Sequence, residues 1–384
     1  MIIKNVNIIT NNEILNNYCI EISDGKIINI ASCIDGGDYL DGKGCYLSAG
    51  FVDTHAHGGG GADFMDLDDD AYQKITYAHM IHGTTSLVPT LLPSSINNLK
   101  RAINNYKNAK NYHTNLLGIH LEGPYISKDQ AGAINKEYIK EPKLAEIKDL
   151  VNEADGAICR ITLAPELNGA SEVIEYLRDN NICISIGHSD ASLDCVKEAC
   201  KKGASLITHF YSACSSIKRI NGYRVCGIVE AGYLIDDLDI EIIADGAHLP
   251  IDLIKYICKF KDLNKISLIT DAMRAAGTDL KETYLGDRKD GTPCIIEDGV
   301  AKLKDRSAFA GSIATSDLLV KTMLKAGVSL VNAIKMITIN PIKALGSKYK
   351  KGQIKVGYDA DLVMFDKDIN ISTVIVGGEI VYKK

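Results

Sequence analysis

Two histidines stand one residue apart in the stretch GFVDTHAHGGGG, residues 50–61. On a β-strand, residues i and i+2 point to the same face, so His55 and His57 would leave the end of a strand side by side. Two neutral imidazoles in that arrangement could bind one metal ion. The glycines that follow would let the backbone pass close to the ion. Because such a pair also arises by chance on protein surfaces, the rest of the chain has to decide.

Further histidines and carboxylates follow apolar runs later in the chain. They are His120 and Glu122 in NLLGIHLE, His188 in ICISIGH, His209 in SLITHF, Asp245 and His248 in DIEIIADGAH, and Asp271 in ISLITDA. Imidazole and carboxylate are ligands of divalent transition metals such as Zn, Fe, Co and Ni. If these ends meet, the ligands would be His55, His57, Glu122, His188, His209 and Asp271. The alternative, that each histidine only satisfies a local hydrogen bond, fits one residue better than the whole set.

Alternating strand-like and helix-like segments would position these residues. The strand-like segments are 50–55, 84–91, 115–122, 157–166, 182–188, 205–210, 239–245 and 266–272. Eight buried strands with crossover helices predict an α/β protein, a (β/α)8 TIM barrel, in which the chemistry lies at the C-terminal ends of the strands. An open, doubly wound parallel sheet is the alternative fold.

The two ends of the chain read differently, as short strands around turns such as Asp24-Gly25. Neither end can bury a core alone, so we expect both to pair into one small β-sandwich domain. The expected domains are residues 1–48 with 348–384 for the β-domain, and 49–347 for the barrel. Residues from about 277 to 313 break the alternation and predict an inserted hairpin.

Composition limits the class of protein. With 384 residues, 46% hydrophobic and 24% charged, the chain is predicted to be ordered and globular. A net charge of −6 gives no general attraction to nucleic acid or to an anionic membrane. No signal-peptide pattern and no long apolar run is present, which predicts a cytoplasmic protein. The 11 cysteines form no C-x-x-C motif and fit reduced packing residues.

These motifs and their order resemble the amidohydrolase superfamily and, within it, the N-acetylglucosamine-6-phosphate deacetylases. The similar segments run nearly end to end: GFVDTHAHG, GIHLEGPYIS, TLAPE, GHSDA, THFYSA, IADGAHL, LITDAM, FAGS, NPIKALG and KGQIKVGYDADLVMFD. The resemblance implies that Glu122, His188 and His209 are the principal metal ligands and that His55 and His57 hold a second ion. It makes Asp271 the catalytic acid and base.

The resemblance also separates branches of the superfamily. Dihydroorotases, hydantoinases and ureases bridge their metals with a carbamylated lysine after the fourth strand, whereas the corresponding segment here, RITLAPE, has no lysine. The carboxylate of Glu122 can take the bridging role instead. The resemblance therefore implies a deacetylase with one or two divalent ions, Zn first and Fe, Co, Ni or Mn as alternatives.

The implied substrate is N-acetylglucosamine 6-phosphate, cleaved to glucosamine 6-phosphate and acetate. The implied substrate contacts are His248, Ala133, Ser212, Ala213 and either Arg219 or Arg224. With Lys218, the two arginines would form an anion clamp. Because a dimer completes the phosphate site in the family that the chain resembles, a homodimer is expected.

The chain departs from the family pattern where substrate is recognised. The family's Gly-Ala-His reads GAI here, so Ile134 replaces a polar contact, and Ser212 replaces an asparagine. The usual HREPG is replaced by KRINGYR, which leaves the phosphate-binding arginine ambiguous. A hydrolase of another N-acetylated amino sugar phosphate, or of an N-acyl amino acid or dipeptide, therefore stays open. A non-catalytic barrel is the alternative outside enzymes, although such proteins typically lose their metal ligands.

Overall fold

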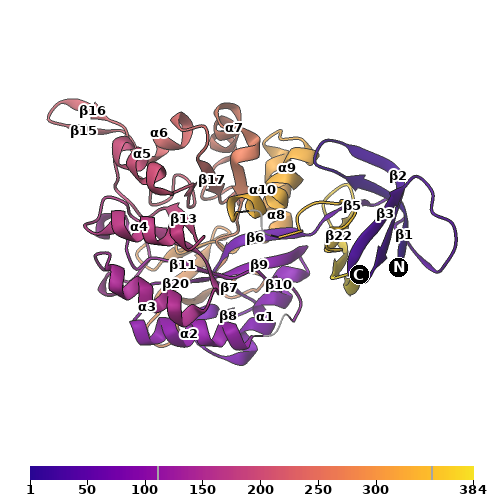
Figure 1. Cartoon of the computed structure of the whole chain (residues 1–384), viewed down its shortest axis with the longest axis horizontal. Helices are drawn as coiled ribbons and strands as arrows, with labels where there is room; N and C mark the ends of the chain where they lie inside the picture. The colour runs from indigo at the N-terminus through magenta and orange to yellow at the C-terminus, as the bar shows by residue number, and fades with distance from the viewer. Residues whose placement is uncertain (110–111, 347–348) are drawn as a thin grey trace.

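The computed structural model describes residues 1–109, 112–346 and 349–384 (Figure 1). Its central sheet contains parallel strands in the spatial order β6, β9, β11, β12, β13, β14, β17 and β18. Their bounds are Phe51–Ala56, Thr84–Leu91, Ile119–Glu122, Ile158–Leu163, Cys183–Ile186, Leu206–Ile207, Asp239–Ile242 and Ile266–Leu268. The short strand β10 (Asn115–Leu116) precedes β11 and pairs with β9. Each predicted strand segment overlaps this sheet, and the segment 115–122 spans both β10 and β11.

The sheet closes into a barrel between its first and last strands. The amide of Asp271 donates to the carbonyl of His55 over 2.9 Å, and the amide of His57 donates to the carbonyl of Ala272 over 2.8 Å. Ala56 and Ala272 form a parallel bridge at the same place. The closure is made by the segments that carry the predicted metal ligands, and it confirms the barrel over the open sheet.

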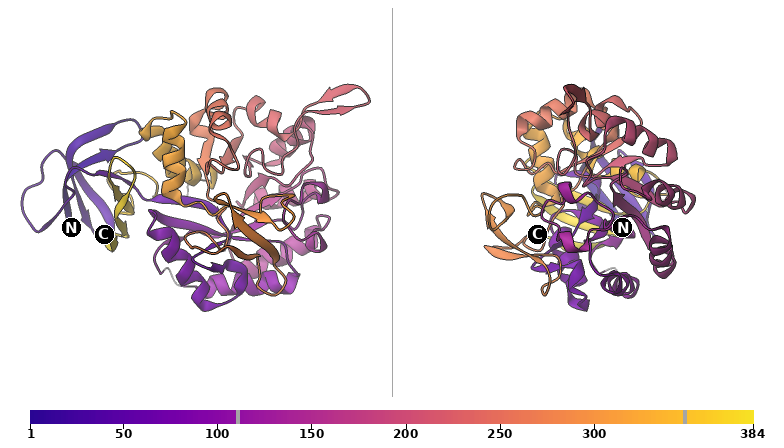
Figure 2. Two further views of the ribbon diagram at one scale, coloured as in Figure 1. Left: turned by 180° about the vertical axis from the view of Figure 1, so that it is seen from behind. Right: turned by 90° about the vertical axis from the view of Figure 1, so that its left-hand side faces the viewer.

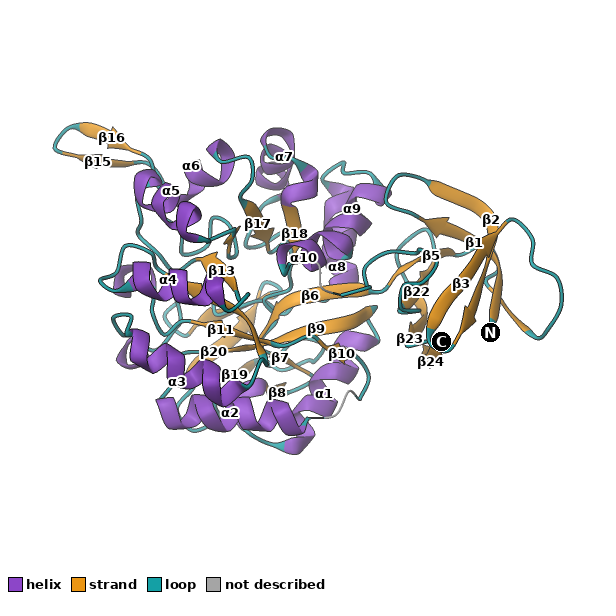
Figure 3. Cartoon of the chain, viewed as in Figure 1, coloured by secondary structure: helices purple, strands orange, loops and turns teal. Residues whose placement is uncertain are grey.

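Helices cover the outside of the barrel (Figure 3). They are α1 (Asp69–Met80), α2 (Ile96–Asn108), α3 (Leu144–Ala154), α4 (Ala170–Asp179), α5 (Leu193–Lys202), α6 (Ile228–Leu234), α7 (Ile251–Phe260), α8 (Ser316–Lys325), α9 (Leu330–Ile337) and α10 (Ile339–Ala344). Short 3-10 turns occupy Phe64–Asp66, Lys128–Gln130, Lys136–Tyr138 and Leu263–Lys265. Helix α5 shows the local logic: the side chain of Ser192 caps its first turn, Val196 and Ala199 are buried against the barrel, and Gly203 ends it. Among the described residues, no helix is long and apolar enough to cross a membrane.

Strands from both ends of the chain form a second sheet beside the barrel (Figure 2). They are β1 (Ile2–Ile9), β2 (Ile14–Ser23), β3 (Lys26–Ala31), β4 (Tyr39–Asp41), β5 (Tyr46–Ala49), β22 (Leu362–Phe365), β23 (Ile371–Val376) and β24 (Glu379–Lys383). The C-terminal strands join the N-terminal ones where β22 pairs antiparallel with β5. Side chains from both ends, among them Ile3, Leu47 and Leu362, share one small core.

The predicted fold class, a barrel with a β-domain built from both termini, is thus confirmed. The exact domain boundaries stay a prediction, and the one expected between residues 347 and 348 lies outside the described residues.

Three small antiparallel sheets follow barrel strands at their C-terminal ends. The smallest pairs β7 (Gly58–Gly59) with β8 (Ala62–Asp63). The predicted hairpin after β18 has a third strand: β19 (Glu282–Leu285) and β21 (Val300–Leu303) both pair with β20 (Thr292–Glu297). After β14, strands β15 (Lys218–Ile220) and β16 (Tyr223–Val225) form a hairpin that extends away from the body, here called the arm, residues 217–225 (Figures 1 and 2).

Candidate metal centre

The barrel brings all six predicted ligand side chains together at one mouth. They come from β6 and the residues just after it, from the end of β11, and from the loops after β13, β14 and β18. They form two groups, each with its ligand atoms within 4.8 Å of one another: His55, His57 and Asp271, and Glu122, His188 and His209. All six are buried. The separate hydrogen-bonding role that we considered for each histidine therefore does not describe this arrangement.

Glu122 lies at the centre of both groups. Its Oε1 atom is 3.0 Å from Nε2 of His209, 3.1 Å from Nε2 of His188 and 3.5 Å from Nε2 of His55. Its Oε2 atom is 3.1 Å from Nε2 of His57. One carboxylate thus faces the imidazoles of both groups, which is the position that a bridging ligand needs.

Asp271 completes the group on the other side. Its Oδ1 atom is 3.2 Å from Nε2 of His57 and 3.5 Å from Nε2 of His55. The backbone of Asp271 is left-handed, with φ of 48°, as are those of His188 at 48° and His209 at 30°. Such angles are uncommon for residues other than glycine and gather at functional sites. Two backbone hydrogen bonds hold the turn in place: the amide of Asp271 donates to the carbonyl of His55 in β6, and the amide of Ser312 donates to the carbonyl of Asp271.

Hydrogen bonds orient two of the ligand imidazoles. Nδ1 of His188 lies 2.7 Å from the carbonyl of Gln130, and Nδ1 of His209 lies 3.0 Å from the carbonyl of Ser212. A carbonyl only accepts, so Nδ1 of each ring donates, and Nε2, which faces Glu122, is the nitrogen left to bind a metal ion. Metal-binding histidines are usually held in this way.

Unpaired buried nitrogens show that the centre fits a cation. Both ring nitrogens of His55 and Nδ1 of His57 are buried without a hydrogen-bond partner among the described residues. Buried polar atoms are rarely left without a partner. A divalent ion would pair with Nε2 of both rings, and nitrogen and carboxylate oxygen donors suit Zn and its neighbours in the transition series.

Without metal, the centre is a cluster of mutually stabilised charges. Burial alone would lower the pKa of His55, but the charges of Glu122 and Asp271 outweigh it and raise this pKa to about 9. The pKa of His57 is raised well above its usual value, because hydrogen bonds to Asp271 and Glu122 also outweigh burial. For Glu122, burial acts to raise the pKa, but the charge of His55 and hydrogen bonds from His188 and His209 hold it well below its usual range.

A cavity of about 240 Å³ opens onto the two groups. Its other lining residues are Leu92, Gly132, Ala133, Ile134, Ser212, Ala213, His248, Leu285, Ala308, Phe309 and Gly311. The predicted substrate contacts Ala133, Ser212, Ala213 and His248 are therefore in the wall. Asp245 orients His248: its Oδ2 atom accepts from Nδ1 over 2.7 Å, and its Oδ1 atom accepts from the His248 amide over 2.8 Å.

The predicted anion clamp lies elsewhere. Arg219 and Arg224 face each other across the arm and are exposed, and neither lines the cavity. The Lys218 ammonium contacts the carboxylate of Asp190. Among the described residues that line the cavity, none is a lysine or an arginine. The Asn221-Gly222 pair was the missed signal: both residues have positive φ and form the two-residue turn that projects the arm.

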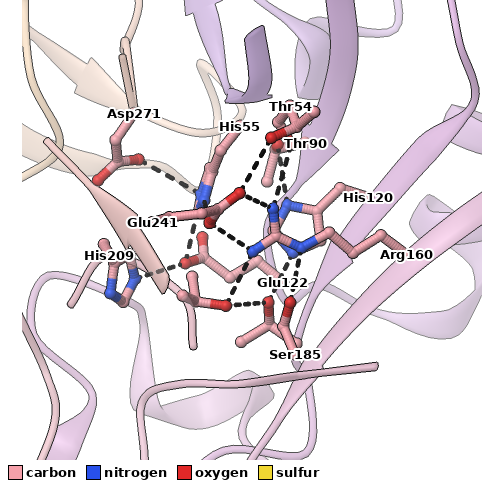
Figure 4. Close-up of polar contacts among 12 residues, drawn as sticks. Thr54, His55, Thr90, His120, Glu122, Arg160, Ser185, His209, Glu241 and Asp271 are labelled. Carbon is pink, nitrogen blue, oxygen red and sulfur yellow. Dashed lines mark hydrogen bonds and ion pairs between the residues drawn. The ribbon is translucent and has the colours of Figure 1, made fainter. Parts of the chain in front are cut away.

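A polar layer beneath the ligands was not predicted. Figure 4 shows the guanidinium of Arg160 and the carboxylate of Glu241 paired below His55, and both side chains are fully buried. His120 belongs to this layer and is not a ligand, because its ring nitrogens lie 3.1 Å from Oγ1 of Thr90 and 2.7 Å from Oγ1 of Thr162.

Comparisons with known proteins give similarities along the whole chain. The profile of the amidohydrolase family matches residues 46–381. The N-acetylglucosamine-6-phosphate deacetylase of Lysinibacillus sphaericus is 33% identical over 386 residues, which cover 99% of this chain and 97% of the relative. The N-acetylgalactosamine-6-phosphate deacetylase of Escherichia coli O157:H7 is 29% identical, with 95% of each chain covered.

A solved structure gives the same similarity in three dimensions. It is an aspartate-to-alanine mutant of the N-acetyl-D-glucosamine-6-phosphate deacetylase of Mycobacterium smegmatis in complex with N-acetyl-D-glucosamine-6-phosphate. The TM-score is 0.91 at 28% identity, and the alignment covers 100% of this chain and 99% of that chain.

Binding of Zn²⁺ to the metal-free protein at pH 7.5 is expected to release protons. The pKa of His55 is about 9 and that of His57 is also raised, so both rings start protonated, and a metal ion binds only the unprotonated ring. The affinity should therefore rise with pH up to about 9. Calorimetric titration in two buffers of different ionisation enthalpy measures the release. His113→Gln, which changes a loop histidine outside the centre, should release as many protons, and identical heats in both buffers would contradict the expectation.

Proposed function

The chain belongs to the amidohydrolase family, and on this basis we propose that it removes the acetyl group from N-acetylglucosamine 6-phosphate. The products are glucosamine 6-phosphate and acetate. The observation that carries the proposal is the convergence of Glu122 with four imidazoles and Asp271 at one mouth of the barrel, where all of these side chains except that of His55 line one cavity. The similarity to N-acetylglucosamine-6-phosphate deacetylases over nearly the full chain supports this choice of substrate.

The proposed cofactor is Zn²⁺, with Fe, Co, Ni and Mn as alternatives, in one or two ions. Glu122, His188 and His209 would hold one ion, and His55, His57 and Asp271 the second. When bound, a divalent cation supplies a Lewis acid that makes water more acidic and polarises an amide carbonyl.

Asp271 is the proposed acid and base. Burial would raise its pKa, but the charges and hydrogen bonds of His55 and His57 lower it, so the carboxylate is ionised at neutral pH and ready to accept a proton. It takes this proton from the attacking water. It then delivers it to the amide nitrogen, because an amine leaves poorly from carbon unless it is protonated. When the C–N bond breaks, acetate and the free amine are formed, and the carboxylate of Asp271 is ionised again.

The wall of the cavity provides the proposed substrate contacts. Nδ1 of His248 is engaged by Asp245, which leaves Nε2 for the substrate. Ala133, Ser212 and Ala213 line the same wall with small side chains, which leave room for the substrate. Ile134, where the family pattern has histidine, adds an apolar surface to it.

A second candidate substrate follows from these departures. Ile134 and Ser212 change the polar contacts in the wall, so the same centre would serve another N-acetylated amino sugar phosphate, or an N-acyl amino acid or dipeptide. The similarity to an N-acetylgalactosamine-6-phosphate deacetylase favours the amino sugar phosphates.

A homodimer is proposed, in which the arm of one protomer brings Arg219 or Arg224 to the phosphate in its partner's cavity. A phosphate dianion is best recognised by arginine, and the described lining residues include neither lysine nor arginine. The arm also exposes apolar side chains that a partner would cover, with Ile217 at 57%, Ile220 at 51% and Tyr223 at 78% exposure. We also predict that the protein acts on a small molecule, binds neither nucleic acid nor membrane, and is located in the cytoplasm.

The choice of substrate is tested on protein reconstituted with Zn²⁺. The panel consists of N-acetylglucosamine 6-phosphate, N-acetylgalactosamine 6-phosphate, unphosphorylated N-acetylglucosamine and N-acetylmethionine, with acetate release as the measurement. We expect the highest kcat/KM on N-acetylglucosamine 6-phosphate, because the arm supplies the charge that its phosphate needs. A higher kcat/KM on either unphosphorylated compound would overturn this assignment, and a preference for the galactosamine epimer would support the second candidate.

Asp271→Asn is expected to lower kcat by about 100-fold or more, since an amide cannot carry the proton from water to nitrogen. Zn²⁺ content, measured by atomic emission, separates loss of the proton carrier from loss of the metal. Glu166→Gln is the matched control, because this carboxylate accepts from Ser189 in a neighbouring loop and belongs to neither ligand group. Near-normal turnover of Asp271→Asn with its metal in place would show that another group moves the proton.

Replacing both arm arginines, Arg219→Ala and Arg224→Ala, should raise KM for the phosphorylated substrate at least tenfold and leave kcat nearly unchanged, because the arm binds phosphate and takes no part in the chemistry. Arg306→Ala removes an exposed arginine from the insertion and serves as the control. Sedimentation velocity should show a dimer for the parent protein. A monomeric parent with full activity would refute the shared site.

A further inference from the structure

The layer beneath the ligands contains a charged pair that barrel interiors rarely hold. Branched apolar side chains usually fill this space. Here Arg160 and Glu241 are 0% and 1% exposed. A buried ion pair is often no more stable than an apolar pair of the same volume, because both charges lose their hydration. Its presence directly below the centre therefore calls for a role other than stability.

Hydrogen bonds hold Glu241 in one orientation. The Arg160 guanidinium contacts both carboxylate oxygens, with Nη2 2.6 Å from Oε2. Its Nε donates to Oγ of Ser185 over 2.8 Å and its Nη2 to Oγ1 of Thr208 over 2.9 Å. Thr54 adds a hydroxyl donor to Oε1 of Glu241 over 3.0 Å. Neither the carboxylate nor its partner can rotate without breaking several of these bonds.

In the described part of the chain, His55 and His57 both lack the Nδ1 acceptor that the other two ligand imidazoles have. His188 and His209 each place Nδ1 against a backbone carbonyl. Nδ1 of His55 is buried and has no hydrogen-bond partner among the described residues. The Oε2 atom of Glu241 lies 3.8 Å from this Nδ1 atom, whereas Glu122 and Asp271 face the other ring nitrogen, Nε2. A carboxylate is a common second partner of metal-binding histidines.

We propose that Glu241, held by Arg160, is the positioning residue for His55. It accepts the proton of Nδ1 and so directs the unprotonated Nε2 toward the ion shared with His57 and Asp271. This inference rests on the proposed metal centre and goes beyond it, since it assigns different supports to the two groups. Backbone carbonyls support the histidines of the Glu122 group, whereas a side-chain carboxylate supports His55.

Glu241→Gln tests this assignment, because glutamine keeps the shape and removes the charge. We expect the affinity of the His55 group for Zn²⁺ to fall about 10- to 100-fold, the usual effect of losing such a partner, while the Glu122 group keeps its affinity. Competition titration against a chromophoric chelator measures both steps. The step that His57→Asn removes identifies the His55 group, and the step that His188→Asn removes identifies the other.

Asp317→Asn is the matched control. Its carboxylate accepts from Nδ1 of His82 over 2.9 Å at the outer helices, away from the centre, so both Zn²⁺ affinities should stay at parental values. If Glu241→Gln does not fold, the double variant Arg160→Met, Glu241→Met removes both charges together, and it is judged by the same two affinities.

Parental affinity at both groups in a folded variant would overturn the inference. An equal loss at both groups would also overturn it, because that is the result expected of general loosening. Acetate release by the parent is scored separately. A parent that releases no acetate from the panel refutes the proposed function, yet a selective loss of Zn²⁺ at the His55 group in Glu241→Gln would still support the positioning role.

Discussion

The carboxylate of Glu122, within 3.0–3.5 Å of four imidazole nitrogens, is the contact on which the rest of the structure depends. These imidazoles come from three places around the mouth of the barrel, the end of β6 and the loops after β13 and β14, so no local segment can assemble the cluster. The barrel must close first, and it closes through the backbone of His55 and Asp271. Fold and centre are therefore one cooperative unit, in which the hydrogen bonds of closure also fix the ligands.

This arrangement has costs that the surroundings offset. His188, His209 and Asp271 adopt left-handed backbone conformations immediately after their strands, which turns their side chains back over the mouth. The interior below them holds threonines, a serine, His120 and the Arg160–Glu241 pair, where an ordinary barrel would place apolar side chains. Every charge in this layer is paired, so the low dielectric strengthens the network and keeps it rigid.

Much of the centre could be predicted from sequence because the end of a parallel strand fixes where a side chain lies. His55 and His57 share a face by their spacing, and Glu122, His188, His209 and Asp271 each follow an apolar run. Depth along the strand is harder to predict. His120 and Glu122 also have i, i+2 spacing and share a face, yet the first lies below the centre and the second within it.

Other features could not be predicted, because they depend on contacts between residues that are far apart in the sequence. Arg160 and Glu241 lie on separate strands, and only the register of the closed barrel brings them together. The basic composition of KRINGYR suggested a phosphate clamp, but the turn at Asn221-Gly222 carries Arg219 and Arg224 away from their own cavity. The third strand of the insertion was missed because the short run at β19 is only half buried.

The pairing of β5 with β22 shapes how the protein is made. Strands β1 to β5 are synthesised before the barrel, but the free edge of β5 finds its neighbour β22 only after the whole barrel has been translated. Until then the nascent chain exposes an unpaired, apolar strand edge of the kind that promotes aggregation. Docking of the last strands is therefore the step that ends this exposure, and a contact spanning nearly the full chain makes that step a slow one. Tags or fusions at the C-terminus act on this late step, whereas changes at the arm leave it untouched.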